Sequence, residues 1–199
     1  VGEGNISRFV EMMNETAERI GLSDTHFKNP SGLPDEEHYS TAYDMAKLTA
    51  YALKMDEFSK IVSTKSKSVA GRNLVNHNKL LRTYEGATGV KTGYTKTAGR
   101  CLVGSAEKDG MTLVSVTLSA PDDWNDHAFL LEKGFSQYAV QQIVEKDQCL
   151  GTREIAGGQA GEVELLASED FSYALAADET PRIVITGQGF VYAPVAEGQ

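Results

Sequence analysis

The sequence predicts a mixed α/β (α+β) fold in which helices pack on an antiparallel sheet, followed by part of a small β-rich domain. Three observations predict it. An amphipathic helical stripe opens the chain, a hairpin signal joins two apolar strand-like runs in its middle, and short glycine-punctuated strands end it. With 199 residues, the chain is long enough for one sizeable core, or for one domain and part of another.

The first predicted helix begins after Asn5. Apolar residues over 6–20 recur at three- and four-residue spacing, which places them on one face of a helix. The Asn5 side chain can cap its start, and Gly21 can end it in the left-handed region. Residues 23–39 hold two prolines and several turn formers, and we expect a structured loop there.

Two more helices are expected before the sheet. Thr41 and Asp44 form a capping-box-like start for a helix over about 42–54. Residues 56–62 are expected to form a short third helix. The first half of the chain therefore supplies mostly helices.

After the third helix, the spacing of the residues changes from a helical pattern to one typical of strands. Residues 64–75 can form a small hairpin. Residues 98–107 and 111–119 are apolar runs joined at Asp109-Gly110, which is a strong hairpin signal. A helix over about 124–142 can then cover the sheet.

A step in charge indicates a domain boundary near residue 140. Residues 140–199 hold 10 acidic and 3 basic residues, so their net charge is −7 of the total −9. We predict a first domain over 1–142 and the start of a β-rich domain over 143–199. The excess of 28 acidic over 19 basic residues argues against nucleic acid as a partner.

The cysteines and histidines indicate no metal site. Cys101 and Cys149 lie 48 positions apart, and the sequence leaves a disulfide between them open. Cys101 lies in an apolar strand pattern, where a buried free thiol is the simpler interpretation. No grouping of Cys and His has zinc-like spacing, so no metal is predicted.

The tripeptide Lys91-Thr92-Gly93 carries the chemical signal of the chain. Lys-Thr-Gly on a strand is one of three motifs that build the active sites of serine β-lactamases and penicillin-binding proteins. The Lys91 ammonium can hold a catalytic serine and attract a carboxylate, to which the Thr92 hydroxyl can donate. Gly93 lets a substrate backbone approach, and the Tyr94 N–H can donate to an oxyanion.

Several further segments match one family in order. The chain resembles the serine-type D-alanyl-D-alanine carboxypeptidases, which are the low-molecular-mass penicillin-binding proteins of peptidase family S11. The likeness covers about residues 5–140. It rests on these segments: Phe27–Leu33, His38–Ala46, Asn76–Leu81, Gly86–Thr95 and Ala98–Leu102. Residues 143–199 look similar to the opening of the β-rich C-terminal domain of that family.

The resemblance implies a β-lactamase/transpeptidase-like fold and a bacterial, extracytoplasmic peptidase. Its partners would be the peptidoglycan stem peptide, which ends in D-Ala-D-Ala and loses its terminal D-alanine, and β-lactam antibiotics, which acylate the same serine. It implies no cofactor. Some family members carry a basic residue near the substrate carboxylate at the place of His77, so His77 is a candidate substrate-binding residue, acting only when protonated. A histidine hydrogen-bonded within its loop is an equal alternative.

Two family motifs do not fit. No Ser-x-Asn occurs, and Ser105-Ala106-Glu107-Lys108 is the sole Ser-x-x-Lys string. We reject Ser105 as the nucleophile because it lies on a predicted strand, whereas a serine and lysine at that spacing meet on one helical turn. We therefore expect an inactive fragment of a carboxypeptidase, truncated at both ends, whose exposed sheet edge pairs with the missing N-terminal segment or with a second copy.

Two other functions remain open from the sequence. A β-lactamase or esterase of the same fold would turn over its acyl-enzyme rapidly. A non-catalytic peptidoglycan-binding or interaction module would explain the missing Ser-x-x-Lys, although it would not require an intact Lys-Thr-Gly.

Overall fold

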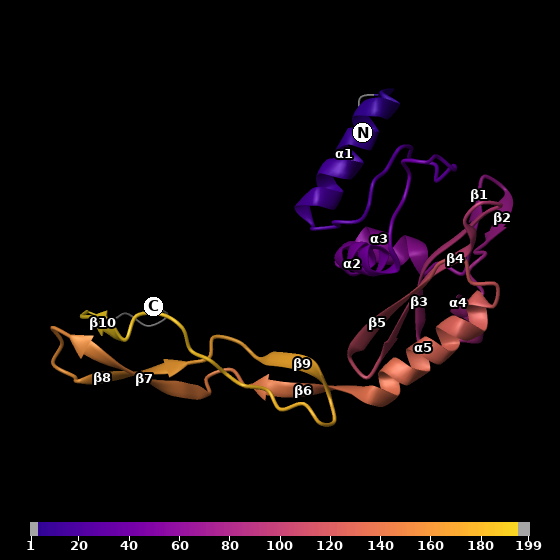
Figure 1. Cartoon of the computed structure of the whole chain (residues 1–199). Helices are drawn as coiled ribbons and strands as arrows, with labels where there is room; N and C mark the ends of the chain where they lie inside the picture. Colours follow the sequence, from indigo (N-terminus) through magenta and orange to yellow (C-terminus); the bar gives the residue numbers. More distant parts are fainter. Residues whose placement is uncertain (1–3, 195–199) are drawn as a thin grey trace. The chain divides into compact units, whose positions relative to one another are not determined.

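A computed structural model describes residues 4–194 of the chain. The chain divides into two compact units that meet between Ser136 and Gln137 (Figure 1). This division falls before the strand Tyr138–Val144, whereas the sequence predicts it at 142/143, inside that strand.

The helices of the first unit begin where local capping predicts. The Asn5 Oδ1 accepts a hydrogen bond from the Arg8 N–H, and the Thr41 Oγ1 accepts one from the Asp44 N–H. Gly21 ends the first helix at φ +74°. The predicted first three helices are thereby confirmed. The helices of this unit are α1 (Ile6–Arg19), α2 (Ala42–Ala52), α3 (Asp56–Val62), α4 (Leu80–Thr83) and α5 (Asp123–Gln137).

The sheet of the first unit is antiparallel. Its three strands, in the order β3-β4-β5, are β3 (Ala87–Thr95), β4 (Gly99–Lys108) and β5 (Met111–Thr117). Asp109 and Gly110 turn the chain between the last two at φ +51° and +76°, as a two-residue hairpin turn requires. β3 is an edge strand, so one side of its backbone is unpaired among residues 4–194.

A separate hairpin lies between α3 and α4, as the sequence predicts. It consists of β1 (Ser66–Val69) and β2 (Arg72–Val75), joined at Ala70-Gly71. The loop that follows it leads directly into α4 and carries His77.

The core of the first unit lies between the sheet and α5. Leu80, Leu102 and Leu131, from α4, β4 and α5, are almost fully buried. The buried His127 ring joins α5 to β5 through hydrogen bonds with Ser115 and Thr117. In Figure 1, α2 and α3 lie on the opposite side of this sheet from α5. The predicted arrangement of helices on an antiparallel sheet is confirmed.

The end of the fifth helix differs from the prediction. The sequence predicts a helix to about 142, but α5 ends at Gln137 and residues 138–144 form a strand. This segment contains Val140, Ile143 and Val144, which favour strands, and it pairs with residues 171–176. The long-range pairing therefore overrides the helical spacing read from the sequence.

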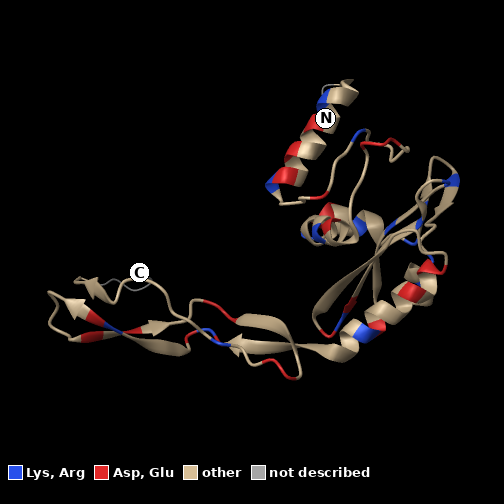
Figure 2. Ribbon diagram, in the orientation of Figure 1, with Lys and Arg blue, Asp and Glu red and all other residues tan. Residues whose placement is uncertain are grey.

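The second unit is made of strands, as predicted. One antiparallel pair is β6 (Tyr138–Val144) with β9 (Phe171–Ala176). A three-stranded sheet has the order β10-β7-β8, formed by β7 (Cys149–Ala156), β8 (Glu162–Leu166) and β10 (Phe190–Tyr192). Figure 2 marks the acidic residues in red along the ribbon of this unit, in keeping with its net charge.

Candidate active site

Strand β3 presents the Lys-Thr-Gly tripeptide at the free edge of the sheet. In the antiparallel register, Thr92 lies opposite Leu102, Gly93 opposite Cys101 and Tyr94 opposite Arg100. The strand is thus held on one side by β4, while the other side of its backbone is open to an added strand.

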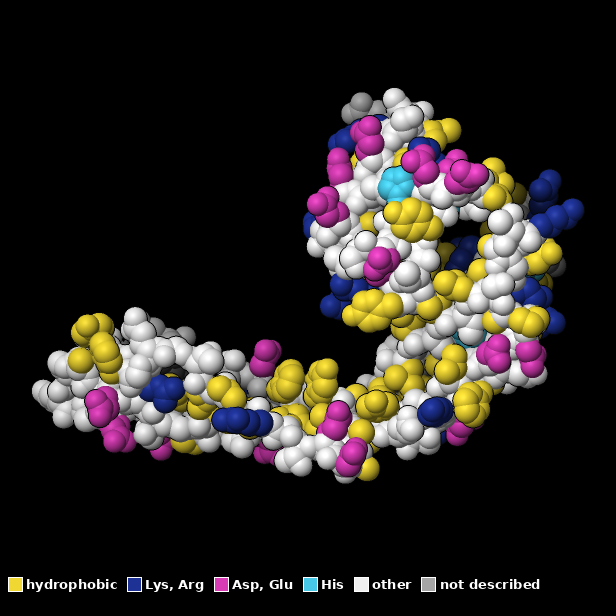
Figure 3. Space-filling model, viewed as in Figure 1, with side chains coloured by type: hydrophobic (Ala, Val, Ile, Leu, Met, Phe, Trp, Pro, Cys, Tyr) yellow, Lys and Arg dark blue, Asp and Glu magenta, His cyan; other side chains and the backbone are white. Residues whose placement is uncertain are grey.

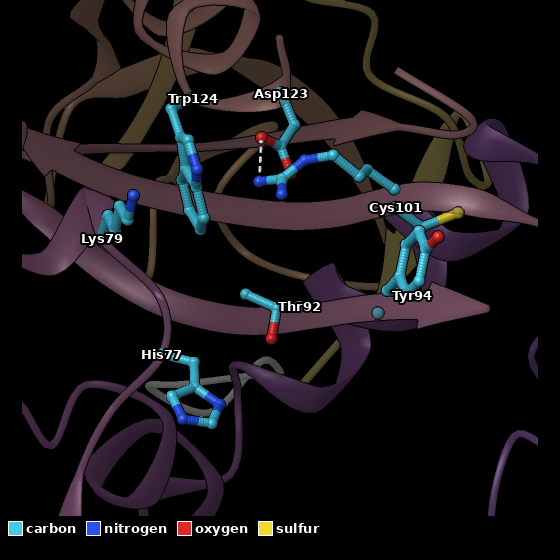
Figure 4. A pocket seen from close by; sticks show the side chains of 9 residues that line it. His77, Lys79, Thr92, Tyr94, Cys101, Asp123 and Trp124 are labelled. Carbon is cyan, nitrogen blue, oxygen red and sulfur yellow. Dashed lines mark hydrogen bonds and ion pairs between the residues drawn. The ribbon is translucent and has the colours of Figure 1, made fainter. Parts of the chain in front are cut away.

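An open cavity of about 470 Å³ lies against this strand. Its walls come from the loop before α4, from β3 and β4, and from the first turn of α5 (Figure 4). The lining residues are His77, Lys79, Thr92, Gly93, Tyr94, Arg100, Cys101, Asp123 and Trp124. The structure therefore gathers four of the five predicted site residues around one cavity.

Lys91 is the predicted site residue that does not line the cavity. Side chains alternate along a strand, so Lys91 and Thr92 project from opposite faces of β3. The exposed Lys91 ammonium donates a hydrogen bond to the Thr92 carbonyl oxygen. Lys91 is adjacent in sequence to Thr92, which lines the cavity, and its side chain is exposed.

The loop that carries His77 is pinned by two asparagines. The Asn76 side chain donates to the Thr64 carbonyl at 3.1 Å and accepts from the Asn78 N–H at 2.9 Å. The Asn78 Oδ1 in turn accepts from the Leu80 N–H. The two asparagine side chains therefore hold the loop backbone. His77 is exposed, and no hydrogen bond joins its ring to another residue within 4–194, so the loop-bonded alternative is not what the structure shows.

Trp124 organises the cationic side of the cavity. The Lys79 Nζ lies 5.8 Å from the centre of the Trp124 ring system, and the Arg100 Cζ lies 5.7 Å from it. Figure 4 shows Lys79 on one side of Trp124 and the ion pair of Asp123 on the other. Cation–π attraction therefore holds two positive charges beside the cavity.

Besides its contact with Trp124, Arg100 is held in place by an ion pair with Asp123. The Arg100 guanidinium donates to the buried Asp123 carboxylate at 2.7 Å, and this hydrogen bond raises the pKa of Arg100. A guanidinium has five N–H donors, so this contact leaves others for a ligand. With Lys79 and Arg100 against Asp123 alone, the cavity carries a net positive charge and favours an anion.

Sequence reasoning missed Lys79, Arg100, Asp123 and Trp124. The available signal for Arg100 was the register of the predicted hairpin, which places it opposite Tyr94. Trp124 is the single tryptophan of the chain and stands in the first turn of a predicted helix, which was the available signal. Cys101 was expected to be buried, but it is a half-buried free thiol that lines the cavity, because it sits opposite Gly93, which has no side chain to cover it.

Ser105 lies where no substrate reaches. It is 0% exposed in the middle of β4, and its hydroxyl is hydrogen-bonded to that of Thr88 at 2.7 Å. Lys108, three residues further along the same strand, projects from the opposite face. The geometry supports the rejection of this pair as nucleophile and base.

Within residues 4–194, no group of three or more His, Cys, Asp or Glu side chains is arranged to hold a metal ion. The chemistry that the cavity offers is that of hydrogen-bond donors and positive charge. Such a site can bind a carboxylate and stabilise negative charge that develops on an oxygen.

Comparisons with known proteins identify the family of the chain. The sequence model of the D-alanyl-D-alanine carboxypeptidases, peptidase family S11, matches residues 2–122. D-alanyl-D-alanine carboxypeptidase DacF of Bacillus subtilis is 35% identical and is aligned over 98% of this chain and 53% of its own length. DacD of Escherichia coli is 33% identical, over 90% of this chain and 48% of its own. The chain spans about half the length of the curated relatives it matches.

Solved structures show the same fold. Penicillin-binding protein 5 of Haemophilus influenzae superposes with a TM-score of 0.80 at 30% identity, over 98% of this chain and 60% of that chain. The Streptomyces K15 DD-transpeptidase gives a TM-score of 0.63 at 32% identity, over 65% of this chain and 55% of that chain. From the family match over residues 2–122 and these likenesses, the chain belongs to the D-alanyl-D-alanine carboxypeptidase family, peptidase family S11.

Proposed function

We propose that this chain forms the Lys-Thr-Gly side of a serine-type D-Ala-D-Ala carboxypeptidase. One observation carries the proposal: Thr92, Gly93 and Tyr94 line a cavity beside an unpaired strand edge, together with cationic side chains. A peptide with a free terminal carboxylate has the charge and the extended backbone that suit such a site.

The substrate would lie along the free edge of β3. Its terminal carboxylate would accept hydrogen bonds from the Thr92 hydroxyl and the Arg100 guanidinium, in the field of Lys79 and a protonated His77. Gly93 lines the cavity and has no side chain, so it leaves room for the substrate backbone. These contacts fix the peptide bond between the last two residues beside Tyr94.

The reaction would proceed in two steps. A serine hydroxyl attacks the carbonyl carbon of the penultimate D-alanine, and the negative charge on that oxygen is stabilised by the Tyr94 backbone N–H. The C–N bond breaks, D-alanine leaves with a proton on its amine, and an ester remains on the serine. Water then hydrolyses the ester and restores the serine. A β-lactam ring would open onto the same serine and remain attached.

The Lys91 ammonium would turn from the Thr92 carbonyl towards that serine. Its exposed side chain is free to make this change, and a positive charge there assists both proton transfer and the approach of the carboxylate. Because Ser105, the serine of the sole Ser-x-x-Lys string, is buried, we place the nucleophile outside residues 1–199.

We further propose that the enzyme acts outside the bacterial cytoplasm, where peptidoglycan lies. None of the helices in the described part of the chain has the length and apolar character needed to cross a membrane. The proposed location rests on the substrate alone.

Fluorescent-penicillin labelling, read by intact mass, tests the function on the 199-residue chain and on a form extended upstream along its gene. We expect labelling and D-alanine release from the extended form alone. Labelling that is lost within minutes would indicate a β-lactamase. An extended form that is neither labelled nor active would overturn the proposal in favour of a non-catalytic module.

A further inference from the structure

The segment over residues 58–84 is positively charged, although the chain as a whole carries a net charge of −9. It contains no Asp or Glu, and it includes the β1–β2 hairpin. Its basic residues are Lys60, Lys65, Lys67, Arg72, Lys79 and Arg82. Lys79 lines the cavity of the candidate active site, whereas neither the proposed carboxylate contacts nor the proposed reaction uses the others.

The hairpin places three of these basic residues on one face. In its antiparallel register, Lys67 lies opposite Leu74, and Val69 lies opposite Arg72. Directly paired residues project from the same face of a hairpin, and so do residues two apart on one strand. Lys65, Lys67 and Arg72 therefore share one face with Val69 and Leu74.

This face is uncovered, and its charges are not neutralised. Val69 is 48% exposed and Leu74 is 55% exposed, and the other residues of β1 and β2 are exposed as well. None of the ion pairs among residues 4–194 includes Lys65, Lys67 or Arg72. Figure 3 shows Lys and Arg side chains that project from the surface in the region of β1 and β2.

The hairpin is held in place at its base and at its tip. At the base, the Asn76 N–H donates to the Lys65 carbonyl oxygen at 2.9 Å, and the Asn76 side chain donates to the Thr64 carbonyl oxygen. At the tip, Ala70 and Gly71 turn the chain with φ values of +48° and +75°, as in a type I′ turn. A surface that is already ordered loses less entropy when it binds a flexible ligand.

The three cations are evenly spaced across the face. Lys65 and Lys67 are about 6.6 Å apart along the chain, since each residue of a strand adds about 3.3 Å. Lys67 and Arg72 are diagonal neighbours on the two strands, which lie about 7–8 Å apart. An extended chain of phosphodiester-linked polyol units has a comparable distance between its successive phosphates. Each of three consecutive phosphates can therefore face one cation.

The composition of the hairpin indicates which kind of polyanion it suits. Residues 64–76 contain no Phe, Tyr or Trp. Proteins that bind single-stranded nucleic acids stack the bases on aromatic side chains, and segments that lie in a bilayer surface insert aromatic or large apolar ones. The face of the hairpin offers only Val69 and Leu74 between its cations, which suit contacts with short methylene groups. A phosphate polymer without bases fits this face better than a nucleic acid or a bilayer does.

We propose that the β1–β2 hairpin is a docking surface for a linear polymer of phosphodiester-linked polyol units. Successive phosphates would pair with Lys65, Lys67 and Arg72, and the carbon atoms of the polyol would lie against Val69 and Leu74. This inference goes beyond the proposed function and does not depend on the reaction. Because β2 leads into the loop that carries His77, a polymer bound here would keep the candidate active site close to it.

The test measures binding of an end-labelled glycerol-phosphate oligomer to the upstream-extended protein by fluorescence anisotropy. We expect saturable binding, and no binding of an uncharged polyglycerol of the same length. Three phosphate contacts on a flexible chain predict a slope of about −2 for log K against log salt concentration, so that Kd rises about twentyfold between 50 and 200 mM salt.

The triple variant Lys65→Gln/Lys67→Gln/Arg72→Gln should raise Kd at low salt by about tenfold, as for the loss of three exposed ion pairs. It should also flatten the dependence on salt. The matched control is Lys108→Gln/Lys133→Gln/Lys146→Gln, which removes the same charge from three exposed lysines that each stand beside an acidic residue in the sequence. The control should bind the oligomer as the unmodified protein does. Equal urea unfolding midpoints for both variants would show that the fold is intact.

Four outcomes would overturn the proposal. They are no binding of the oligomer, equal losses in the two triple variants, equal affinity for poly-L-glutamate, and binding to phosphatidylglycerol vesicles without binding to the oligomer. The third outcome would indicate attraction to any polyanion, and the fourth would assign the hairpin to a bilayer surface. Penicillin labelling of the same protein is a separate measurement, so failure of the proposed function and failure of this docking surface are distinguishable.

Discussion

The imidazole of His127 occupies the space that a side chain at Gly104 would need. A Cβ built on Gly104 would come within 2.6 Å of the His127 Nδ1, and within 3.0 Å of a Leu80 methyl group. The close approach of α5 to the sheet therefore depends on the missing side chain at Gly104, because the His127 ring is fully buried and hydrogen-bonded at both nitrogens. The same helix places Asp123 and Trp124 at the candidate active site.

Gly104→Ala is expected to destabilise the first unit by about 1–3 kcal/mol, as other overpacked cores are. The free energy of unfolding from urea titration measures this. Gly93→Ala is the matched control, since its added Cβ would approach nothing closer than 3.8 Å and the position has no positive φ. Equal stability of the two variants would show that α5 can move away from β4 without cost.

His127 should make the first unit less stable in mild acid. Burial lowers the pKa of His127 from its ordinary value near 6.5, and the nearby Asp123 carboxylate offsets only part of that effect. The unfolded chain therefore binds a proton that the folded chain does not, and stability falls as the pH drops below about 6.5, by at most about 1.4 kcal/mol per unit.

Urea unfolding measured between pH 7.5 and 5 checks this dependence, in the range above that where most carboxylates titrate. His127→Gln keeps a hydrogen-bonding side chain but does not titrate, so its slope over this range should be smaller. The same slope in both proteins would assign the acid sensitivity to other groups.

Local signals predicted the parts of the fold that depend on neighbours in the sequence. Asn5, Thr41 and the Asp109-Gly110 turn each act within four residues, and each was found where expected. The strand at 138–144 was missed because its partner, Phe171–Ala176, lies about thirty residues further on. Helical spacing cannot reveal such a pairing.

The residues of the candidate site likewise divide into those that the sequence could name and those that only the fold brings together. Thr92, Gly93 and Tyr94 are consecutive, and His77 follows from the resemblance, so four lining residues could be named in advance. Arg100, Asp123 and Trp124 meet only because α5 packs on the sheet and the hairpin sets Arg100 opposite Tyr94. Lys91 shows another limit of the sequence. The motif identifies the residue, but it does not predict the direction in which its side chain points.

Arg100→Gln should weaken the preference of the extended protein for a free terminal carboxylate. The kcat/KM ratio between an acyl-D-alanyl-D-alanine peptide and its C-terminal amide should fall by about tenfold, because a charge-assisted hydrogen bond is lost. Arg72→Gln, on the exposed β1–β2 hairpin, is the matched control. An unchanged ratio would remove Arg100 from carboxylate recognition and leave Thr92, Lys79 and His77.

Ser105→Ala should leave penicillin labelling of the extended protein intact. The Ser105 hydroxyl is buried against Thr88, so its removal costs one hydrogen bond, about 1 kcal/mol of stability, and touches no reacting group. Lys91→Ala is the positive control, for which the acylation rate should fall by at least about a hundredfold, since proton-transfer catalysis and a positive charge are both lost. Rates are read from the time course of fluorescent-penicillin incorporation. Loss of labelling in Ser105→Ala with its unfolding curve unchanged would make Ser105 the nucleophile, and β4 would then have to open for the reaction to occur.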